Sequence, residues 1–220
     1  MTMHISTLPP NDQAGFGQML AIYQSSIEPS EQKPAEELAK CLRDPRYHFL
    51  VARNGDEVAG FSIQFFPSSG GFWLLEYLAV DQRTRSKGLG CRIFVHARDA
   101  AAARAPGAPC LLEVDQSVPP VALTHDKPSD DTVRRLAFYR LLHCRKLEGL
   151  DYILPLDVGG TPPPMLLLVH GLEWETSVPK ATVRHWLTTL YVEVYECTPR
   201  DARIAIMLAS ASDIIPLSTI

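Results

Sequence analysis

The sequence predicts an α/β chain with a mixed central sheet flanked by helices, and three observations lead to this prediction. Apolar residues recur at helical spacing near the N-terminus, in residues 11–32. Asn54-Gly55 joins two strand-like apolar runs, which indicates a β-hairpin. Further along the chain, strand-like and helix-like runs alternate, as they do in α/β proteins.

The first part of the chain is predicted to form two helices followed by three antiparallel strands. The helix over residues 11–32 is followed by a short one over residues 33–45, which ends before Pro45. After the hairpin, a third strand over residues 71–80 is apolar except for Glu76. Such a run is typical of a central strand that is covered on both faces.

The second part is predicted to alternate between helices and strands. We expect a helix over residues 90–105, a strand over residues 109–116 and an amphipathic helix over residues 132–144. Two further strands follow, over residues 145–156 and 165–174. Together these elements form a first domain.

The predicted first domain covers residues 1–175, and residues 176–220 form a C-terminal extension. A helix is expected from Ser177 to about Tyr195, whereas the conformation of the apolar tail 200–220 is ambiguous. Because exposed apolar surface promotes association, we expect the tail to pack on the first domain or on the partner subunit of a homodimer.

The composition excludes several classes of protein. The chain has 220 residues, 46% of them hydrophobic, and a net charge of −4, which argues against a nucleic-acid or anionic-membrane surface. The five cysteines form no C-x-x-C pair, so reduced thiols are expected rather than a disulfide framework or a metal site. Neither a secretory signal nor a membrane-spanning run is visible, and a cytoplasmic protein is expected.

Positive charge and glycine coincide where the third strand leads into the following helix. A helix N-terminus offers unpaired N–H groups to an anion, and glycine lets the backbone approach it closely. The alternative is a solvated basic turn. The motif fits neither a P-loop nor a dinucleotide fingerprint. The candidate anion-binding residues are Arg85, Ser86, Lys87, Gly88, Leu89 and Gly90.

In its context this junction resembles the core motif of the GNAT (general-control-related N-acetyltransferase) superfamily, a strand followed by Q/R-x-x-G-x-G/A and a helix. Arg85, Gly88 and Gly90 occupy the three motif positions. The strand CLLEVDQ and the helix RRLAFYRLLHCRKL, with its Arg-x-x-x-Phe-Tyr pattern, follow in the family's order. The resemblance extends over residues 15–172.

The resemblance implies a GNAT acyltransferase fold that uses acetyl-CoA, or a related acyl-CoA, as co-substrate. It implies that backbone amides and basic side chains of residues 85–90 bind the pyrophosphate. In this family the third antiparallel strand and the strand after the helix splay apart around the pantetheine arm. This would place the backbone of Leu78 and Val80 beside the thioester.

Three carboxylates are candidates for the general base or for binding the acceptor amine. Glu76 is the preferred base, because a charge inside an apolar strand is costly and burial raises a carboxyl pKa. The alternative for Glu76 is a carboxylate satisfied by a neighbouring group. Glu113 and Asp115, on the next strand, could act as base or hold an ammonium, or could simply be solvated.

Tyr139 is the preferred general acid, because a tyrosine at this point of the family's helix lies near the CoA sulfur. The alternative is a core tyrosine in the helix stripe. His143-Cys144 stands where the family has Gly-Phe, which predicts a different turn from helix to strand. The family's Asn before the tyrosine is also missing.

The predicted activity is transfer of an acetyl group from acetyl-CoA to a primary amine by direct attack in a ternary complex. The acceptor is a small amine, an amino acid or the amine of a peptide; no metal, nucleic acid or membrane is expected to take part. The alternative is a non-catalytic acyl-CoA-binding or interaction module on the same fold.

Overall fold

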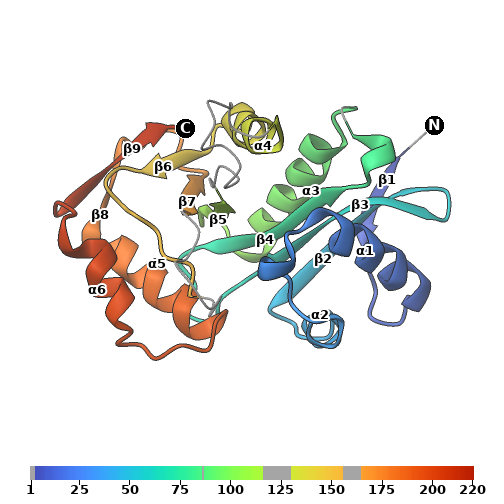
Figure 1. Cartoon of the computed structure of the whole chain (residues 1–220), viewed down its shortest axis with the longest axis horizontal. Coiled ribbons are helices and arrows are strands. Elements are labelled where there is room, and N and C mark those ends of the chain that lie inside the picture. Colours follow the sequence, from blue (N-terminus) through green and yellow to red (C-terminus); the bar gives the residue numbers. More distant parts are fainter. Residues whose placement is uncertain (1–2, 86, 116–129, 156–164) are drawn as a thin grey trace, which may run out of the picture. The chain divides into compact units, whose positions relative to one another are not determined.

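The computed structural model describes residues 3–85, 87–115, 130–155 and 165–220 (Figure 1). The chain divides into two compact units, residues 1–108 and 109–220, and each is described by itself.

The N-terminal unit contains one antiparallel sheet in the order β1-β2-β3-β4. The β2–β3 hairpin turns just after Asn54, as the sequence predicts. Its elements are β1 (His4–Thr7), α1 (Gln13–Ser26), η1 (Pro29–Glu31), α2 (Ala35–Cys41), β2 (Tyr47–Asn54), β3 (Glu57–Phe65), β4 (Trp73–Val80), η2 (Gln82–Thr84) and α3 (Leu89–Arg104).

Helices α1 and α3 cover opposite faces of this sheet (Figure 1). Alternate residues of β3, among them Phe61 and Ile63, are fully buried in a core with Met19 and other side chains of α1. Gly60 points to the other face, where a Cβ would come within 2.9 Å of the Ile93 side chain of α3. The glycine therefore lets α3 lie close to the sheet.

The C-terminal unit contains antiparallel strands in the order β5-β7-β6-β9-β8. Helices α5 and α6 pack against each other within this unit. Its elements are β5 (Cys110–Asp115), α4 (Asp130–Leu141), β6 (Arg145–Leu147), β7 (Met165–His170), β8 (Ser177–Pro179), α5 (Lys180–Glu193), α6 (Ala202–Ala209) and β9 (Ile214–Thr219).

The segment from residue 176 onward belongs to the same unit as β5–β7. The ambiguous tail forms α6 and β9, and β9 lies between β6 and β8 in the sheet. The predicted start of the last helix at Ser177 is wrong, because residues 177–179 pair with β9 and α5 begins at Lys180.

Within the described ranges, none of the helices is both long and apolar enough to cross a membrane. All five cysteines are free thiols.

Candidate active site

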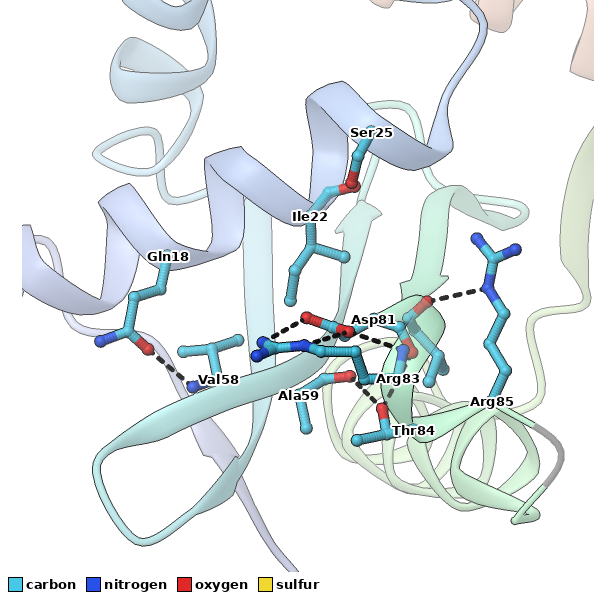
Figure 2. Close-up of polar contacts among 10 residues, drawn as sticks. Gln18, Ile22, Ser25, Val58, Ala59, Asp81, Arg83, Thr84 and Arg85 are labelled. Carbon is cyan, nitrogen blue, oxygen red and sulfur yellow. Dashed lines mark hydrogen bonds and ion pairs between the residues drawn. The ribbon is translucent and has the colours of Figure 1, made fainter.

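The connection from β4 to α3 begins with a turn that is fixed by its own side chains (Figure 2). Asp81 accepts a hydrogen bond from the backbone N–H of Arg83 at 2.8 Å and also pairs with its guanidinium. The Thr84 hydroxyl donates to the carbonyl oxygens of Ala59 and Asp81, at 3.2 and 3.0 Å. These contacts hold the chain at the end of β4, just before Arg85 and Lys87.

Arg85 is exposed and its side chain folds back along the end of β4 (Figure 2). Its Nε donates to the carbonyl oxygen of Val80 at 3.2 Å, and Nη2 lies 3.4 Å from the Ser26 hydroxyl. Lys87 is exposed as well. Two cationic side chains therefore flank the start of α3, whereas Ser86, the third predicted residue of this run, lies outside the described residues.

The N-terminus of α3 has no side-chain cap. Its N-cap, Gly88, has a φ of 72° and is exposed, with open space where a Cβ would lie. By contrast, Asp12 and Asp201 accept N–H bonds at the starts of α1 and α6. The first N–H groups of a helix have no partner within it, so this 16-residue helix presents donors and a positive dipole to an anion.

Leu89 is buried under the start of α3, and Gly90 lies in its first turn. Leu78 and Val80 form the last part of β4, paired with Ser62 and Gly60 of β3. The predicted CoA-binding residues that the structure describes in this unit thus lie along one continuous stretch, from the end of β4 to the start of α3.

Glu76 occupies a β-bulge in the β3–β4 ladder. Ile63 pairs with Tyr77 and Gln64 with Leu75, so Glu76 is the extra residue on β4. In a regular strand, Glu76 and Tyr77 would point to opposite faces. Here both reach the segment between α1 and α2: Glu76 contacts Lys33, and the Tyr77 hydroxyl donates to the carbonyl of Glu31 at 2.9 Å. The bulge therefore re-aims the carboxylate.

Lys33 and Glu76 form a buried ion pair. Lys33 Nζ lies 2.6 Å from Glu76 Oε1, and the side chains are only 13% and 5% exposed. The second oxygen, Oε2, is buried and finds no hydrogen-bond partner among the described residues. One oxygen of the carboxylate is thus held by a cation, and the other is able to accept a proton or a hydrogen bond.

The electrostatics of this pair follow from its burial. Burial raises the pKa of Glu76 above its ordinary value, and the ammonium of Lys33 opposes that rise. Burial lowers the pKa of Lys33, but attraction to the Glu76 carboxylate and the hydrogen bond to it, together with smaller contributions from Tyr47 and Cys41, raise the pKa of Lys33 overall. The geometry is that of an ammonium against a carboxylate more basic than an exposed glutamate.

Tyrosines surround the pair. The Lys33 Nζ lies 3.5 Å from the Tyr47 hydroxyl, and the Lys33 backbone N–H donates to the Tyr23 hydroxyl at 2.7 Å. Tyr23 and Tyr77 meet edge to face, with ring centroids 4.9 Å apart. Lys33 was not predicted from the sequence. The available signal was only that a charge inside an apolar strand requires a partner.

In the C-terminal unit, Tyr139 lies on α4, partly buried, with its ring edge-on to Phe138 at a centroid distance of 5.3 Å. Helix α4 ends in a turn in which His143 has a φ of 57°. The N–H groups of His143 and Cys144 donate to the carbonyls of Arg140 and Tyr139. Histidine thus takes the left-handed position that glycine usually fills at a helix end.

Glu113 and Asp115 of β5 both have partners. The hydroxyls of Tyr152 and Tyr195 donate to Glu113 Oε1 and Oε2, the second at 2.7 Å. Asp115 lies 4.0 Å from Nη1 of Arg135 on α4. Both Glu113 oxygens are occupied, so this carboxylate ties β5 to residues further along the same unit.

Comparison with known proteins gives a family match over part of this chain. Residues 16–122 match the family model described as the acetyltransferase (GNAT) family. No curated protein sequence matches the chain significantly.

Three solved structures illustrate the fold. A GNAT-family protein from Bacteroides thetaiotaomicron has a TM-score of 0.64 and 23% identity, and the match covers 89% of this chain and 99% of that one. An aminoglycoside 6'-N-acetyltransferase in complex with coenzyme A has a TM-score of 0.58 and 18% identity, and the match covers 76% of this chain and 95% of that one. The ribosomal-protein-S18-alanine N-acetyltransferase from Escherichia coli has a TM-score of 0.53 and 19% identity, and the match covers 77% of this chain and 93% of that one.

At these identities the three likenesses show the fold alone. The match to the Bacteroides protein covers more than residues 1–175 could account for, so it includes part of the C-terminal segment. The predicted fold class is confirmed. Residues 16–122 therefore form an acetyltransferase domain of the GNAT family, and the solved structures share its fold.

Proposed function

We propose that this protein transfers an acetyl group from acetyl-CoA, or another acyl group from a related acyl-CoA, to a primary amine by direct attack in a ternary complex. The observation that carries the proposal is the exposed, uncapped start of α3 at Gly88, flanked by Arg85 and Lys87 within the GNAT domain. A pyrophosphate suits this stretch, because N–H donors, the positive end of a helix dipole and two cationic side chains lie within a few residues of one another.

The reaction requires a proton acceptor for the amine, and Glu76 supplies it through Oε2. The amine nitrogen attacks the thioester carbon as Glu76 takes its proton, the N–C bond forms and the C–S bond breaks. The backbone of Leu78 and Val80 orients the thioester. The leaving thiolate takes a proton from the Tyr139 hydroxyl.

The acceptor is a small amine, an amino acid or a peptide amine. The names of two proteins of the same fold, an S18-alanine N-acetyltransferase and an aminoglycoside 6'-N-acetyltransferase, cover both ends of this range. Because one fold hosts many acceptors, these names do not choose between them.

A non-catalytic acyl-CoA-binding module is the second candidate. The ion pair at Glu76 favours it, because a carboxylate held by Lys33 could be purely structural. Turnover distinguishes the two: a module binds acetyl-CoA but releases no CoA with any amine.

Calorimetric titration with acetyl-CoA tests the proposal. We expect the wild-type protein to bind in the micromolar range, and Arg85→Ala and Gly88→Asp to weaken binding at least about tenfold, as expected for loss of a charge-assisted contact or repulsion of a phosphate. Gly107→Asp is the matched control for Gly88→Asp, because Gly107 at the other end of α3 has a φ of 74° and equally open surroundings.

Thiol release with a library of amines then tests turnover, with Tyr139→Phe as the acid-deficient variant. No binding of acetyl-CoA or longer acyl-CoAs by the wild-type protein would contradict the proposal. Equal weakening by Gly107→Asp would show that the effect is one of folding.

A further inference from the structure

We propose that Lys33 is a positioning residue of this active site: its ammonium holds Glu76 Oε1 and directs the proton of the acceptor amine to Oε2. This inference rests on the proposed function, in which Glu76 is the base. It adds a residue that lies outside β4 and outside the CoA-binding loop.

The first support is the rigidity with which Lys33 is held. It precedes Pro34, the N-cap of α2, and proline restricts the backbone of the preceding residue. Its N–H donates to the hydroxyl of Tyr23, and its Nζ lies 5.8 Å from the centroid of the Tyr47 ring. Both the backbone and the ammonium are therefore fixed before any ligand arrives.

The second support is the direction in which Glu76 points. The bulge on β4 turns its side chain to the face where Lys33 lies, with 2.6 Å between Nζ and Oε1. In this geometry the lysine occupies one carboxylate oxygen only. Oε2 stays buried without a partner among the described residues, an arrangement that is unfavourable and calls for an explanation.

The third support is the set of charges around the carboxylate. Among the described residues, Lys33 is the cation that contacts Glu76. Glu37 of α2, half exposed, lies 3.7 Å from Lys33 Nζ and disfavours the charge on Glu76 only weakly. The other titratable groups that face the pair are neutral at physiological pH, and burial raises their pKa values further; they are Tyr23, Cys41 and Tyr47.

Removal of Lys33 would leave a buried carboxylate without compensation. Such a group takes up a proton rather than remain charged, and a protonated Glu76 cannot accept another from the amine. Lys33 therefore acts on the reaction through the ionisation of Glu76.

The pH dependence of kcat/KM for CoA release tests this role in the full-length protein. In Lys33→Met we expect the acidic limb of the pH profile of kcat/KM to shift to higher pH by about 1–3 units. This is the range over which an adjacent opposite charge shifts a carboxyl pKa. Lys33→Arg, which keeps the charge, should restore most of the wild-type limb. Binding of acetyl-CoA should stay unchanged in both variants, since the predicted CoA loop lies elsewhere in the unit.

Arg53→Met is the matched structural control. Arg53 forms a part-buried ion pair with Asp12 at the start of α1 in the same unit, and it is more exposed than the Lys33–Glu76 pair. We expect this change to lower stability without moving the limb. An acidic limb that is the same in Lys33→Met and in the wild type would overturn the proposal.

Carboxyl NMR with 13C-labelled glutamate separates this proposal from the function on which it rests. The Glu76 signal, assigned by its loss in Glu76→Gln, should titrate at higher pH in Lys33→Met than in the wild type. If it does so while no amine supports CoA release, the ion pair stands but the acetyltransferase reaction and the catalytic role of Lys33 both fall. If the signal does not shift, Lys33 does not control Glu76 and this proposal alone is wrong.

Discussion

Each unit of the chain places a glutamate inside a strand, and the two are satisfied in different ways. Glu76 of β4 is held through one oxygen by the ammonium of Lys33, and its other oxygen has no partner among the described residues. Glu113 of β5 accepts a tyrosine hydroxyl on each oxygen. A carboxylate with both oxygens occupied holds a fold together, whereas one with a buried oxygen still to be satisfied is available for chemistry.

The largest expected effect comes from the same isosteric change, glutamate to glutamine, made at Glu76 and at Glu113; it distinguishes a catalytic carboxylate from a structural one. Glu76→Gln should lower kcat by about 10²- to 10⁴-fold, the usual contribution of a general base. Glu113→Gln should leave kcat within a few-fold of wild type but lower the free energy of unfolding by about 1–3 kcal/mol, since one tyrosine hydroxyl loses its acceptor. Steady-state CoA release and urea unfolding measure the two effects.

The comparison would break if the roles were exchanged. A large loss of kcat in Glu113→Gln with a normal unfolding curve would make Glu113 the base. The same loss in both variants, with both folded, would indicate that the two carboxylates act together.

The sequence was sufficient to predict the local elements but not the pairing of Glu76. The turn at Asn54-Gly55, β4 and the start of α3 follow from short-range patterns that the structure reproduces. Lys33 and Glu76 are 43 positions apart, and their contact depends on a bulge that reverses the face of one residue. A pattern of period two would have directed Glu76 towards α3.

The strands that escaped prediction are short and lie at or near the edges of their sheets. β1 has four residues, of which Ile5 is buried, and β8 has three. Runs of this length carry no periodicity of their own. β9 contains Pro216, which made the tail ambiguous as a strand. Such segments become strands because a neighbouring strand offers them hydrogen bonds.

A smaller effect is expected on stability at alkaline pH, where the Lys33–Glu76 ion pair loses its charge on Lys33. Lys33 has a raised folded pKa, so its contribution to stability is complete below the unfolded value of about 10.4 and is lost as the pH rises through the folded pKa. Burial also raises the pKa values of Tyr47 and Tyr191, so both units lose stability in the same direction. We expect the loss to begin near pH 10 and the Lys33 contribution to it to reach about 1–3 kcal/mol by roughly pH 12.

Urea unfolding across this range measures the loss, and the double variant Lys33→Met, Glu76→Gln is the control. Because it lacks the pair but keeps the tyrosines, its stability should fall less steeply than that of the wild type. Parallel curves would show that the tyrosines alone account for the alkaline loss, and that the pair contributes nothing to it.

The smallest expected effect concerns the turns, where the two units also differ. In the described part of the N-terminal unit, every residue with positive φ is a glycine, whereas the C-terminal unit places His143 and Glu196 in this region. A left-handed conformation costs a residue with a Cβ about 1 kcal/mol, and the His143 side chain is exposed. His143→Gly should therefore raise the free energy of unfolding by about 0.5–1 kcal/mol, measured by urea unfolding, with Glu196→Gly as a second site of the same kind.

This change also tests whether the departure from the family's Gly-Phe matters for function. His143 follows α4, the helix that carries Tyr139, and the Cys144 N–H already closes the turn onto the Tyr139 carbonyl at 3.0 Å. If the histidine only occupies a position that glycine favours, His143→Gly stabilises the protein and leaves both acetyl-CoA binding and kcat unchanged. A stabilised variant that loses activity would show instead that the imidazole takes part in the reaction, and would bring a residue of this turn into the active site beside Tyr139.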